Sequence, residues 1–304
     1  MSETVAVEVE GRTLRLSNLD KVLYPEIGLT KGEIIHYYTA VAPVLLPHLA
    51  GRPLTVKRYP SGVEGQFFYE KNASRGKPDW VRTVRLPAPG STKNRDEIDY
   101  IVVEELATLV WLANLAALEL HTPQWTVGPR GGVRGADQLV LDLDPGAPAA
   151  IGECCRVALL LREALAADGL TAVAKTSGSK GMQLYAAIKE TPSDTVNAYA
   201  HELAKGLEAE HPDLVVSRMT KSLRPGKVLV DWSQNNAAKT TVSVYSLRAR
   251  PTATVSCPVT WDEVEAGADG TPLSFTQADV LGRIADGDLF EPLLGTVRPA
   301  LPRR

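Results

Sequence analysis

The residues with the clearest chemical potential are two aspartates at the end of an apolar strand. The segment Leu139–Gly146 reads LVLDLDPG. Strand side chains alternate between faces, so Asp142 and Asp144 point to one side and Leu143 points to the other. Two close carboxylates repel each other, and a divalent cation with hard oxygen ligands, Mg²⁺ or Mn²⁺, relieves the repulsion. The Pro-Gly pair ends the strand where a ligand can reach it. In isolation, the pattern also fits two solvated aspartates.

A second apolar run, Val228–Asp231, also ends in a carboxylate. Three carboxylates from two neighbouring strands can hold two divalent ions that bridge a triphosphate and an attacking hydroxyl. Taken alone, Asp231 would more often be a cap or an ion-pair partner. Beside the first strand and a basic segment, a role as metal ligand is favoured.

Basic and small residues near these strands would suit a polyphosphate. Residues 215–250 contain seven Lys or Arg against one acid, a net charge of +6, although the whole chain carries −3. Such a face attracts anions, although a solvated charged surface is the alternative. The loop Ser177–Gly181 offers backbone N–H groups, hydroxyls and Lys180 to an anion, but it lacks Walker spacing and also resembles a simple turn. Phe67, Phe68 and Tyr69 could stack bases or belong to the core.

Composition limits the class of protein. The chain has 304 residues, of which 44% are hydrophobic, enough for a substantial core. No apolar run approaches the roughly 18 residues of a membrane span, and the acidic start is not a signal peptide. Three cysteines without a CxxC pair support neither a zinc ribbon nor a disulfide framework. We therefore expect a soluble cytoplasmic protein without a membrane partner.

Helices alternate with strands along the chain, which indicates an α/β or α+β fold. Thr30–Glu33 reads as a capping box that opens a helix, with a kink or restart at Pro43. The other expected helices are 104–120, 149–168, 192–210 and 277–286. The expected strands are 54–59, 171–176, 183–188, 228–231 and 240–246, in addition to the strand that ends at Asp144. A loop is expected at 128–135 and a flexible tail at 293–304.

Eight segments, taken in order, resemble the polymerase domain of bacterial DNA ligase D, a member of the archaeo-eukaryotic primase superfamily that serves non-homologous end joining. The segments are DKVLYP (20–25), GRPLTVKRYP (51–60), FFYEKNA (67–73), ELHTPQW (119–125), LVLDLDPG (139–146), KTSGSKGMQLY (175–185), TKSLRPGKVLVDWSQNN (220–236) and KTTVSVYSLRARP (239–251). They span about residues 17 to 265.

The resemblance implies a primase-polymerase fold, with mixed or antiparallel central sheets and flanking helices, in a single catalytic domain over 1–292. Within it, about 1–130 would contact DNA, and about 131–292 would hold metal and nucleotide. The resemblance implies that Asp142, Asp144 and Asp231 bind two Mn²⁺ or Mg²⁺ ions. The incoming NTP or dNTP would be bound by Lys57, Ser177, Ser179, Lys180, Gln183, Arg224, Gln234, Lys239 and Arg248. Lys21 and Lys31 would hold a DNA 5′-phosphate, and Phe68, Tyr69 and His121 would lie at the template or near the active site.

Two departures from the family pattern stand out. The family's SGSKGxH motif ends here in Gln183, which keeps hydrogen-bonding capacity but cannot carry charge near pH 7. We therefore expect altered nucleotide affinity or turnover. Nothing resembles the KxDG site of a DNA ligase, which suggests a free-standing polymerase that works with a separate ligase and a Ku-type end-binding protein on gapped or broken, preferably 5′-phosphorylated DNA.

Two other functions remain open at this point. A haloacid-dehalogenase-like phosphohydrolase also uses a DxD strand end, but such enzymes place it near the N-terminus and follow it with Thr or Val rather than Pro145. A non-catalytic nucleic-acid-binding module on a primase fold is the second alternative. Three intact aspartates argue against it, whereas Gln183 leaves it open.

Overall fold

A computed structural model describes residues 4–87 and 96–302. The helices are α1 (Lys31–Leu49), α2 (Leu106–Asn114), α3 (Ile151–Ala167), α4 (Ser193–Glu210), α5 (Trp261–Ala268) and α6 (Gln277–Arg283). The strands are β1 (Thr4–Val9), β2 (Arg12–Ser17), β3 (Val22–Tyr24), β4 (Leu29–Thr30), β5 (Pro53–Arg58), β6 (Phe68–Glu70), β7 (Thr83–Pro87), β8 (Glu97–Val102), β9 (Ala117–Thr122), β10 (Trp125–Val127), β11 (Val133–Pro145), β12 (Ala172–Thr176), β13 (Met182–Thr191), β14 (Val215–Val216), β15 (Val228–Asp231), β16 (Thr241–Val242) and β17 (Pro258–Val259).

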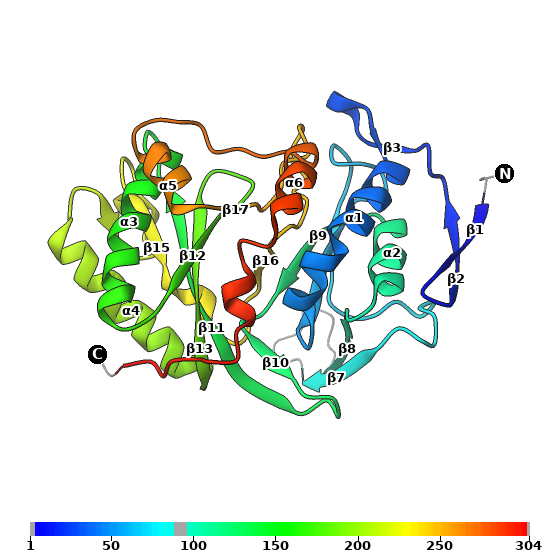
Figure 1. Ribbon diagram of the computed structural model, residues 1–304, viewed down its shortest axis with the longest axis horizontal. Helices are drawn as coiled ribbons and strands as arrows, with labels where there is room; N and C mark the ends of the chain where they lie inside the picture. Colours follow the sequence, from blue (N-terminus) through cyan, green and yellow to red (C-terminus); the bar gives the residue numbers. More distant parts are fainter. Residues whose placement is uncertain (1–3, 88–95, 303–304) are drawn as a thin grey trace.

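The larger sheet has seven strands in the order β14-β15-β11-β13-β12-β17, with β10 attached to β11. All its pairs are antiparallel except β14–β15. Leu139, Leu141 and Leu143 on β11 point to one face and are buried with residues of α3 and α4. These two helices lie together on the left in Figure 1. Because side chains alternate, the opposite face of the same strand carries Asp142 and Asp144.

The second sheet has six antiparallel strands in the order β16-β9-β5-β8-β7, with β6 attached to β5. It shares a core with α1 and α2, and these elements occupy the right half of Figure 1. Val140, Val173 and Tyr185, from the acidic face of the larger sheet, belong to this second core. The aspartates therefore lie on the face of one sheet that is turned toward the other.

These mixed sheets with flanking helices confirm the expected fold class. Most expected elements are present, including the Thr30 capping box. The helix that it opens runs unbroken from Lys31 to Leu49 with both Pro43 and Pro47 inside, so the expected restart at Pro43 is wrong. No helix in the described ranges is both long and apolar enough to cross a membrane.

Three further assignments of helix, strand and loop boundaries are wrong. The helix expected over 104–120 ends at Asn114, and 117–122 forms β9, because a continuous apolar run fits a fully buried strand as well as a buried helix. The strand expected over 240–246 is reduced to Thr241–Val242, and Tyr245 has a positive φ of 61° that no strand residue adopts. The loop expected over 128–135 ends early, since β11 already begins at Val133.

The C-terminal segment was expected to be a flexible tail. In the structure Leu293 is buried, and the Arg298 guanidinium donates to the Asp137 carbonyl. The Lys189 amide donates to the Pro299 carbonyl at 2.7 Å, and Leu301 packs against the core beneath the larger sheet. The expectation is therefore wrong for the part of the tail up to 302, which is held against the domain by polar and apolar contacts.

Candidate active site

The three aspartates meet on two adjacent strands. Asp142 on β11 is paired in register with Asp231 on β15, and Asp144 lies two residues further along β11. One carboxylate oxygen from each residue lies within 4.8 Å of the others. The sequence-based expectation that these carboxylates converge is confirmed.

Asp231 is held in a fixed orientation by the residues that follow it. Its Oδ1 accepts hydrogen bonds from the Ser233 amide at 3.0 Å and the Ser233 hydroxyl at 2.5 Å. Its Oδ2 accepts from the Gln234 side-chain amide at 2.8 Å. Lys239 donates to the Ser233 hydroxyl. Gln234 and Lys239, which the resemblance assigns to the nucleotide, thus lie beside this carboxylate.

The electrostatics of the cluster favour a bound cation. Burial, and then the charge of Asp144, raise the pKa of Asp142 to about 7. Burial, and then the charge of Asp231, raise the pKa of Asp144, while Arg224 opposes that shift. Carboxylates that resist ionisation in each other's presence are stabilised when a divalent ion supplies positive charge. The donor set, three carboxylates, is that of a hard cation such as Mg²⁺ or Mn²⁺.

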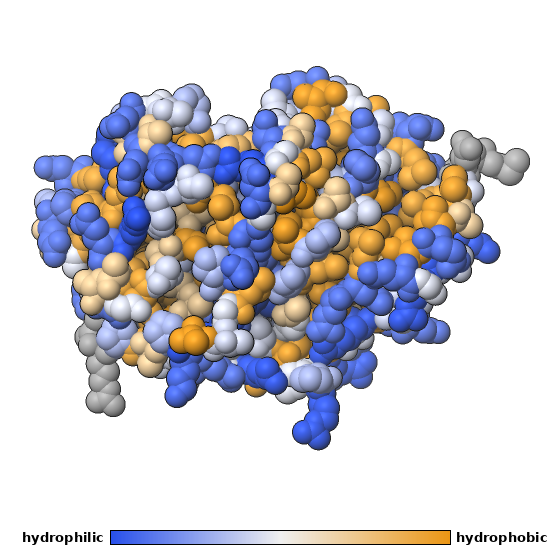
Figure 2. Space-filling model, viewed as in Figure 1, coloured by the Kyte–Doolittle hydropathy of each residue, from blue (hydrophilic) through white to orange (hydrophobic). Residues whose placement is uncertain are grey.

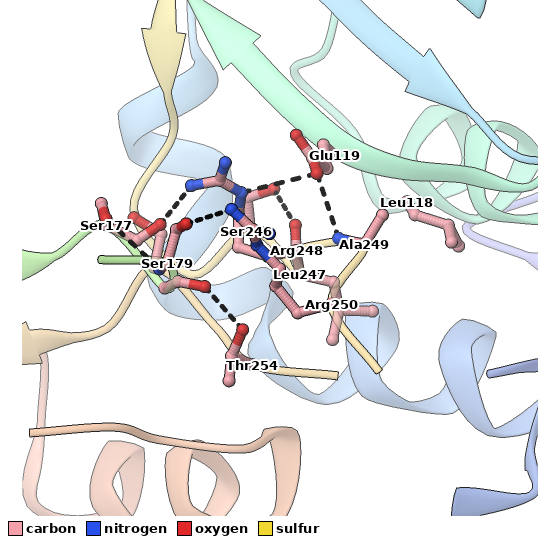
Figure 3. Close-up of polar contacts among 12 residues, drawn as sticks. Leu118, Glu119, Ser177, Ser179, Ser246, Leu247, Arg248, Ala249, Arg250 and Thr254 are labelled. Carbon is pink, nitrogen blue, oxygen red and sulfur yellow. Dashed lines mark hydrogen bonds and ion pairs between the residues drawn. The ribbon is translucent and has the colours of Figure 1, made fainter. Parts of the chain in front are cut away.

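The loop between β12 and β13 lies beside a pair of arginines (Figure 3). Arg248 donates to the Ser177 carbonyl, and Arg250 donates to the Ser179 hydroxyl. The Thr254 hydroxyl donates to the Gly178 carbonyl at 2.6 Å. The amides of Ser179 and Gly181 donate to the Ser177 hydroxyl at 3.2 and 3.3 Å, so these two N–H groups are already used within the loop. Beyond these two amides, the loop and its neighbours offer an anion the arginines, the exposed Lys180 and the Ser179 hydroxyl.

Gly181 is required for the loop to approach the acidic strand. A Cβ atom at this position would lie 1.9 Å from the Leu143 carbonyl oxygen, which is backbone and cannot swing away. We expect Gly181→Ala to lower the free energy of unfolding by about 2–3 kcal/mol, the range for overpacking against a fixed core. Urea unfolding measures it. Gly206→Ala, on α4 with no atom within 4 Å of the new Cβ, is the control and should not destabilise.

Glu119 is a buried carboxylate behind Arg248 that the sequence analysis did not identify. Its Oε1 accepts from the Ala249 amide at 3.0 Å and lies 3.5 Å from the Arg248 Nε (Figure 3). Its Oε2 contacts His121 Nε2 at 3.0 Å. Burial opposes ionisation, but the His121 hydrogen bond and the Arg248 charge outweigh it and lower the pKa of Glu119 to about 2. Burial lowers the pKa of His121, although Glu119 opposes that shift. Glu119 therefore anchors Arg248 as a charged partner.

Lys57 on β5 lies among aromatic rings from β6 and from the residues beside it. Its ammonium is 4.0 Å from the Phe67 ring centre and 5.6 Å from that of Tyr69, and burial lowers its pKa. Phe68 and Tyr69 are 44% and 57% exposed, so their rings are open to a partner. Tyr69 also faces His121 edge to face. The aromatic run is thus surface rather than core.

A groove of about 1900 Å³ opens beside these aromatics. Phe68, Tyr69 and Trp125 line it together with charged residues of both signs: five basic (Lys71, Arg75, Lys77, Arg85 and Arg134) and six acidic (Glu70, Asp79, Glu97, Asp99, Glu190 and Asp194). It also reaches Ala238 and Thr240, which flank Lys239, but the three aspartates are outside its lining. Figure 2 shows hydrophilic residues along the lower edge of the molecule and hydrophobic residues over the region of α1 and α2.

Lys21 and Lys31 are brought together at the start of α1. The Lys31 amide donates to the Lys21 carbonyl at 2.9 Å, and the Gly32 amide donates to the Leu19 carbonyl at 2.8 Å. These two N–H groups of the helix start are therefore already used by the preceding turn and are not free to bind a phosphate. Lys21 is exposed, whereas Lys31 is 5% exposed and donates to the Asn114 carbonyl at 3.1 Å. Burial, and then the charge of Lys21, lower the pKa of Lys31.

Arg224 and Gln183 both lie at the acidic cluster. The charge of Arg224 opposes the rise in the pKa of Asp144. Its guanidinium donates to the Met219 carbonyl at 2.7 Å, and its buried Nε has no hydrogen-bond partner. Gln183 donates to Asp142. Lys175, Glu119 and Arg250 are site residues that the sequence analysis missed. Alternation along β9 and β12 places Glu119 and Lys175 on definite faces, but only the strand register reveals what they face.

Comparisons with known proteins agree with this geometry. The family model for the primase-polymerase domain of LigD matches residues 30–290. The multifunctional non-homologous end joining DNA repair protein LigD of Mycobacterium tuberculosis is 43% identical over 285 residues, 91% of this chain but 36% of that protein. The bifunctional LigD of Bacillus subtilis is 32% identical over 273 residues, 89% of this chain and 42% of that protein. The chain thus spans about a third to two fifths of these relatives' length.

One solved structure is similar to this chain over nearly the whole length of both. The polymerase domain of Mycobacterium tuberculosis ligase D, determined in complex with DNA, is 42% identical, with a TM-score of 0.87. The match covers 93% of this chain and 99% of that one.

Proposed function

The chain belongs to the LigD primase-polymerase family and is a nucleotidyltransferase of that type, and we propose that it extends or fills DNA ends with NTPs or dNTPs by a two-metal reaction at Asp142, Asp144 and Asp231. The observation that carries the proposal is the convergence of these three carboxylates within 4.8 Å, beside a loop flanked by Arg248 and Arg250.

Each part of the site has a place in this reaction. The three aspartates would hold two ions, Mn²⁺ or Mg²⁺, which when bound lower the pKa of the attacking hydroxyl and neutralise the leaving pyrophosphate. Ser233 and Gln234 orient Asp231. The triphosphate would be bound by Ser177, Ser179, Lys180, Gln183, Arg224, Gln234, Lys239, Arg248 and Lys57, all of which are cationic or carry hydrogen-bond donors suited to phosphate oxygens.

DNA would occupy the groove beside the second sheet. The exposed rings of Phe68 and Tyr69, the second of which faces His121, would offer stacking surfaces for template bases. The basic side chains, which stand among a similar number of acids, would contact individual phosphates. The M. tuberculosis domain of the same fold was solved with DNA, which supports this assignment.

A cellular role follows from the relatives' names. Because they are non-homologous end joining proteins, we place this chain in the same repair process, in the cytoplasm at the nucleoid. Residues 1–292 would act as one catalytic unit, with a Ku-type end-binding protein and a separate ligase as partners. These proposals about process and partners are taken from whole relatives, and the chain covers only part of their length.

A primer-extension assay tests the proposal and separates it from the alternatives. Purified protein is given gapped DNA, Mn²⁺ and labelled nucleotide. Extension of the primer supports the proposed reaction. Release of inorganic phosphate without extension would favour a phosphohydrolase, and DNA binding without either product would favour a non-catalytic module; both results would contradict the proposal.

The 5′-phosphate site gives a further prediction. We expect wild-type protein to bind gapped DNA with a 5′-phosphate several-fold more tightly than the 5′-hydroxyl form, and Lys21→Ala to remove most of that preference. Because the helix N–H groups are occupied, the lysine side chains would supply the attraction. The log–log salt slope for phosphorylated DNA should become shallower by about one unit. Fluorescence anisotropy measures both quantities.

Lys21 is the better position for this test. Lys31 is buried against the end of α2, so its removal would also disturb packing. Lys205→Ala, an exposed lysine on α4 paired with Glu202, controls for net charge. If Lys21→Ala lowers the affinity for both DNAs equally, Lys21 contributes only a general electrostatic attraction and does not recognise the 5′-phosphate.

A further inference from the structure

Four side chains form one row across the larger sheet, from β12 to β15. The register pairs Lys175 with Gln183, Gln183 with Asp142, and Asp142 with Asp231. Residues directly opposite each other on neighbouring strands point to the same face. The row therefore begins at a lysine and ends at the proposed metal ligands.

Lys175 is enclosed at its end of the row. The residue is 1% exposed, and its ammonium donates to Gln183 Oε1 at 2.5 Å, Ser256 Oγ at 2.5 Å and the Val242 carbonyl at 3.1 Å. Burial lowers the pKa of Lys175 to about 7, and in the charged form all three N–H donors of the ammonium are used. No carboxylate is among these partners, so Lys175 does not form an ordinary ion pair.

Lys175 determines which way the Gln183 amide faces. An ammonium only donates hydrogen bonds, so the atom of Gln183 beside it must be the carbonyl oxygen. The NH₂ group then faces the next strand, where it donates to Asp142 Oδ1 at 3.0 Å. Gln183 is 4% exposed and has little room to rearrange. The bond uses part of the acceptor capacity of Asp142 and leaves its remaining lone pairs for a cation.

We propose that Lys175 and Gln183 are positioning residues that fix the carboxylate of Asp142 for its metal ion, with Lys175 acting through Gln183. The inference rests on the proposed metal site. In this arrangement Gln183 needs no charge for its role, because its amide supplies one acceptor for Lys175 and one donor for Asp142.

Geometry and charge predict opposite results for Lys175→Met. If Lys175 acts only as a nearby positive charge, its removal strengthens the binding of a cation. If it positions Asp142 through Gln183, its removal frees the amide and weakens binding about tenfold, the scale of one lost hydrogen bond to a charged group. The sign of the change in Mn²⁺ affinity therefore separates the two roles.

The experiment measures Mn²⁺ binding to nucleotide-free protein by the electron paramagnetic resonance signal of free Mn²⁺, with thermal unfolding in EDTA as a check on folding. We expect Lys175→Met and Gln183→Met each to weaken binding about tenfold, and the double variant to be within about twofold of the weaker single one, because the residues act in series. Gln183→His should retain most of the wild-type affinity for Mn²⁺, since a neutral imidazole has one donor and one acceptor. Lys205→Met controls for the lost charge.

Tighter or unchanged binding in Lys175→Met would overturn the inference, as would additive losses in the double variant. Should Lys175→Met fail to fold, Gln183→Met and Gln183→His carry the test, and equal affinities in these two would overturn it. Failure of the metal site itself gives a different result: wild-type protein would bind no Mn²⁺, or Asp142→Asn would bind it as wild type does.

Discussion

Asp142→Asn should reduce nucleotide transfer by about a thousandfold or more while the protein stays folded. In the proposed two-metal reaction, loss of one ligand would remove charge that stabilises both the attacking and the leaving oxygen, which is worth several kcal/mol of the barrier. Asparagine keeps the shape of the side chain and an oxygen that can accept the Gln183 hydrogen bond. Primer extension under single-turnover conditions measures the loss. Asp144→Asn and Asp231→Asn should behave alike.

The same variant should be more stable than wild type when metal is removed, and the gain should depend on pH. The pKa of Asp142 is about 7 in the folded chain and about 4 in an unfolded chain. Between these values the folded state binds more protons, so the stability that this carboxyl contributes is complete below about pH 4 and is lost as the pH rises through 7. Asparagine has no such loss, and we expect it to gain about 1–2 kcal/mol between pH 4 and pH 8.

Urea unfolding in EDTA at several pH values measures this gain. Asp213→Asn, at an exposed acid in the turn before β14, is the control and should follow the wild-type curve. Retention of more than a tenth of wild-type extension by Asp142→Asn would exclude Asp142 from the metal site. A stability difference that does not change with pH would mean that the carboxyl is not strained in the apo protein.

The sequence could predict the acidic cluster because two local rules were sufficient. Alternation along β11 puts Asp142 and Asp144 on one face, and an apolar run that ends in Asp231 repeats the pattern. That β15 lies next to β11 was an assumption that the resemblance supported, since nothing local pairs strands more than eighty residues apart. The helix ends marked by capping residues, such as Thr30, were also predictable.

The failures had physical causes. A buried apolar run has no period, so 104–120 could not be divided into α2 and β9 from its residues alone. Glu119 and Lys175 were missed because their roles depend on residues that they contact only in the folded chain. Arg248 is far along the chain from Glu119, and Gln183 faces Lys175 only after β12 and β13 are in register. At Lys21 and Lys31 the sequence indicated the cations, but it could not show that the Lys21 carbonyl occupies the Lys31 amide.

Arg248→Met should raise the KM for the incoming nucleotide about 10- to 100-fold and change the affinity for DNA much less. Arg248 is 17% exposed in its side chain, donates to the Ser177 carbonyl and is paired with Glu119, so its guanidinium is held in place before a nucleotide arrives. A preorganised cation beside a phosphate is worth about 1.5–3 kcal/mol, the range of a hydrogen bond to a charged group. Steady-state kinetics over a range of nucleotide concentrations measures the effect.

Two further variants separate a specific contact from general attraction. Arg218→Met removes a cation of the same basic stretch whose side chain is 66% exposed, and it should leave the nucleotide KM within about twofold of wild type. Glu119→Gln keeps an acceptor for the Ala249 amide but removes the charge that holds Arg248, so it should raise the KM in the same direction by a smaller factor. Equal increases in Arg248→Met and Arg218→Met would mean that the basic stretch attracts nucleotide only through its summed charge. An increase confined to Arg248→Met and Glu119→Gln would identify the buried ion pair as the element that holds the triphosphate site in shape.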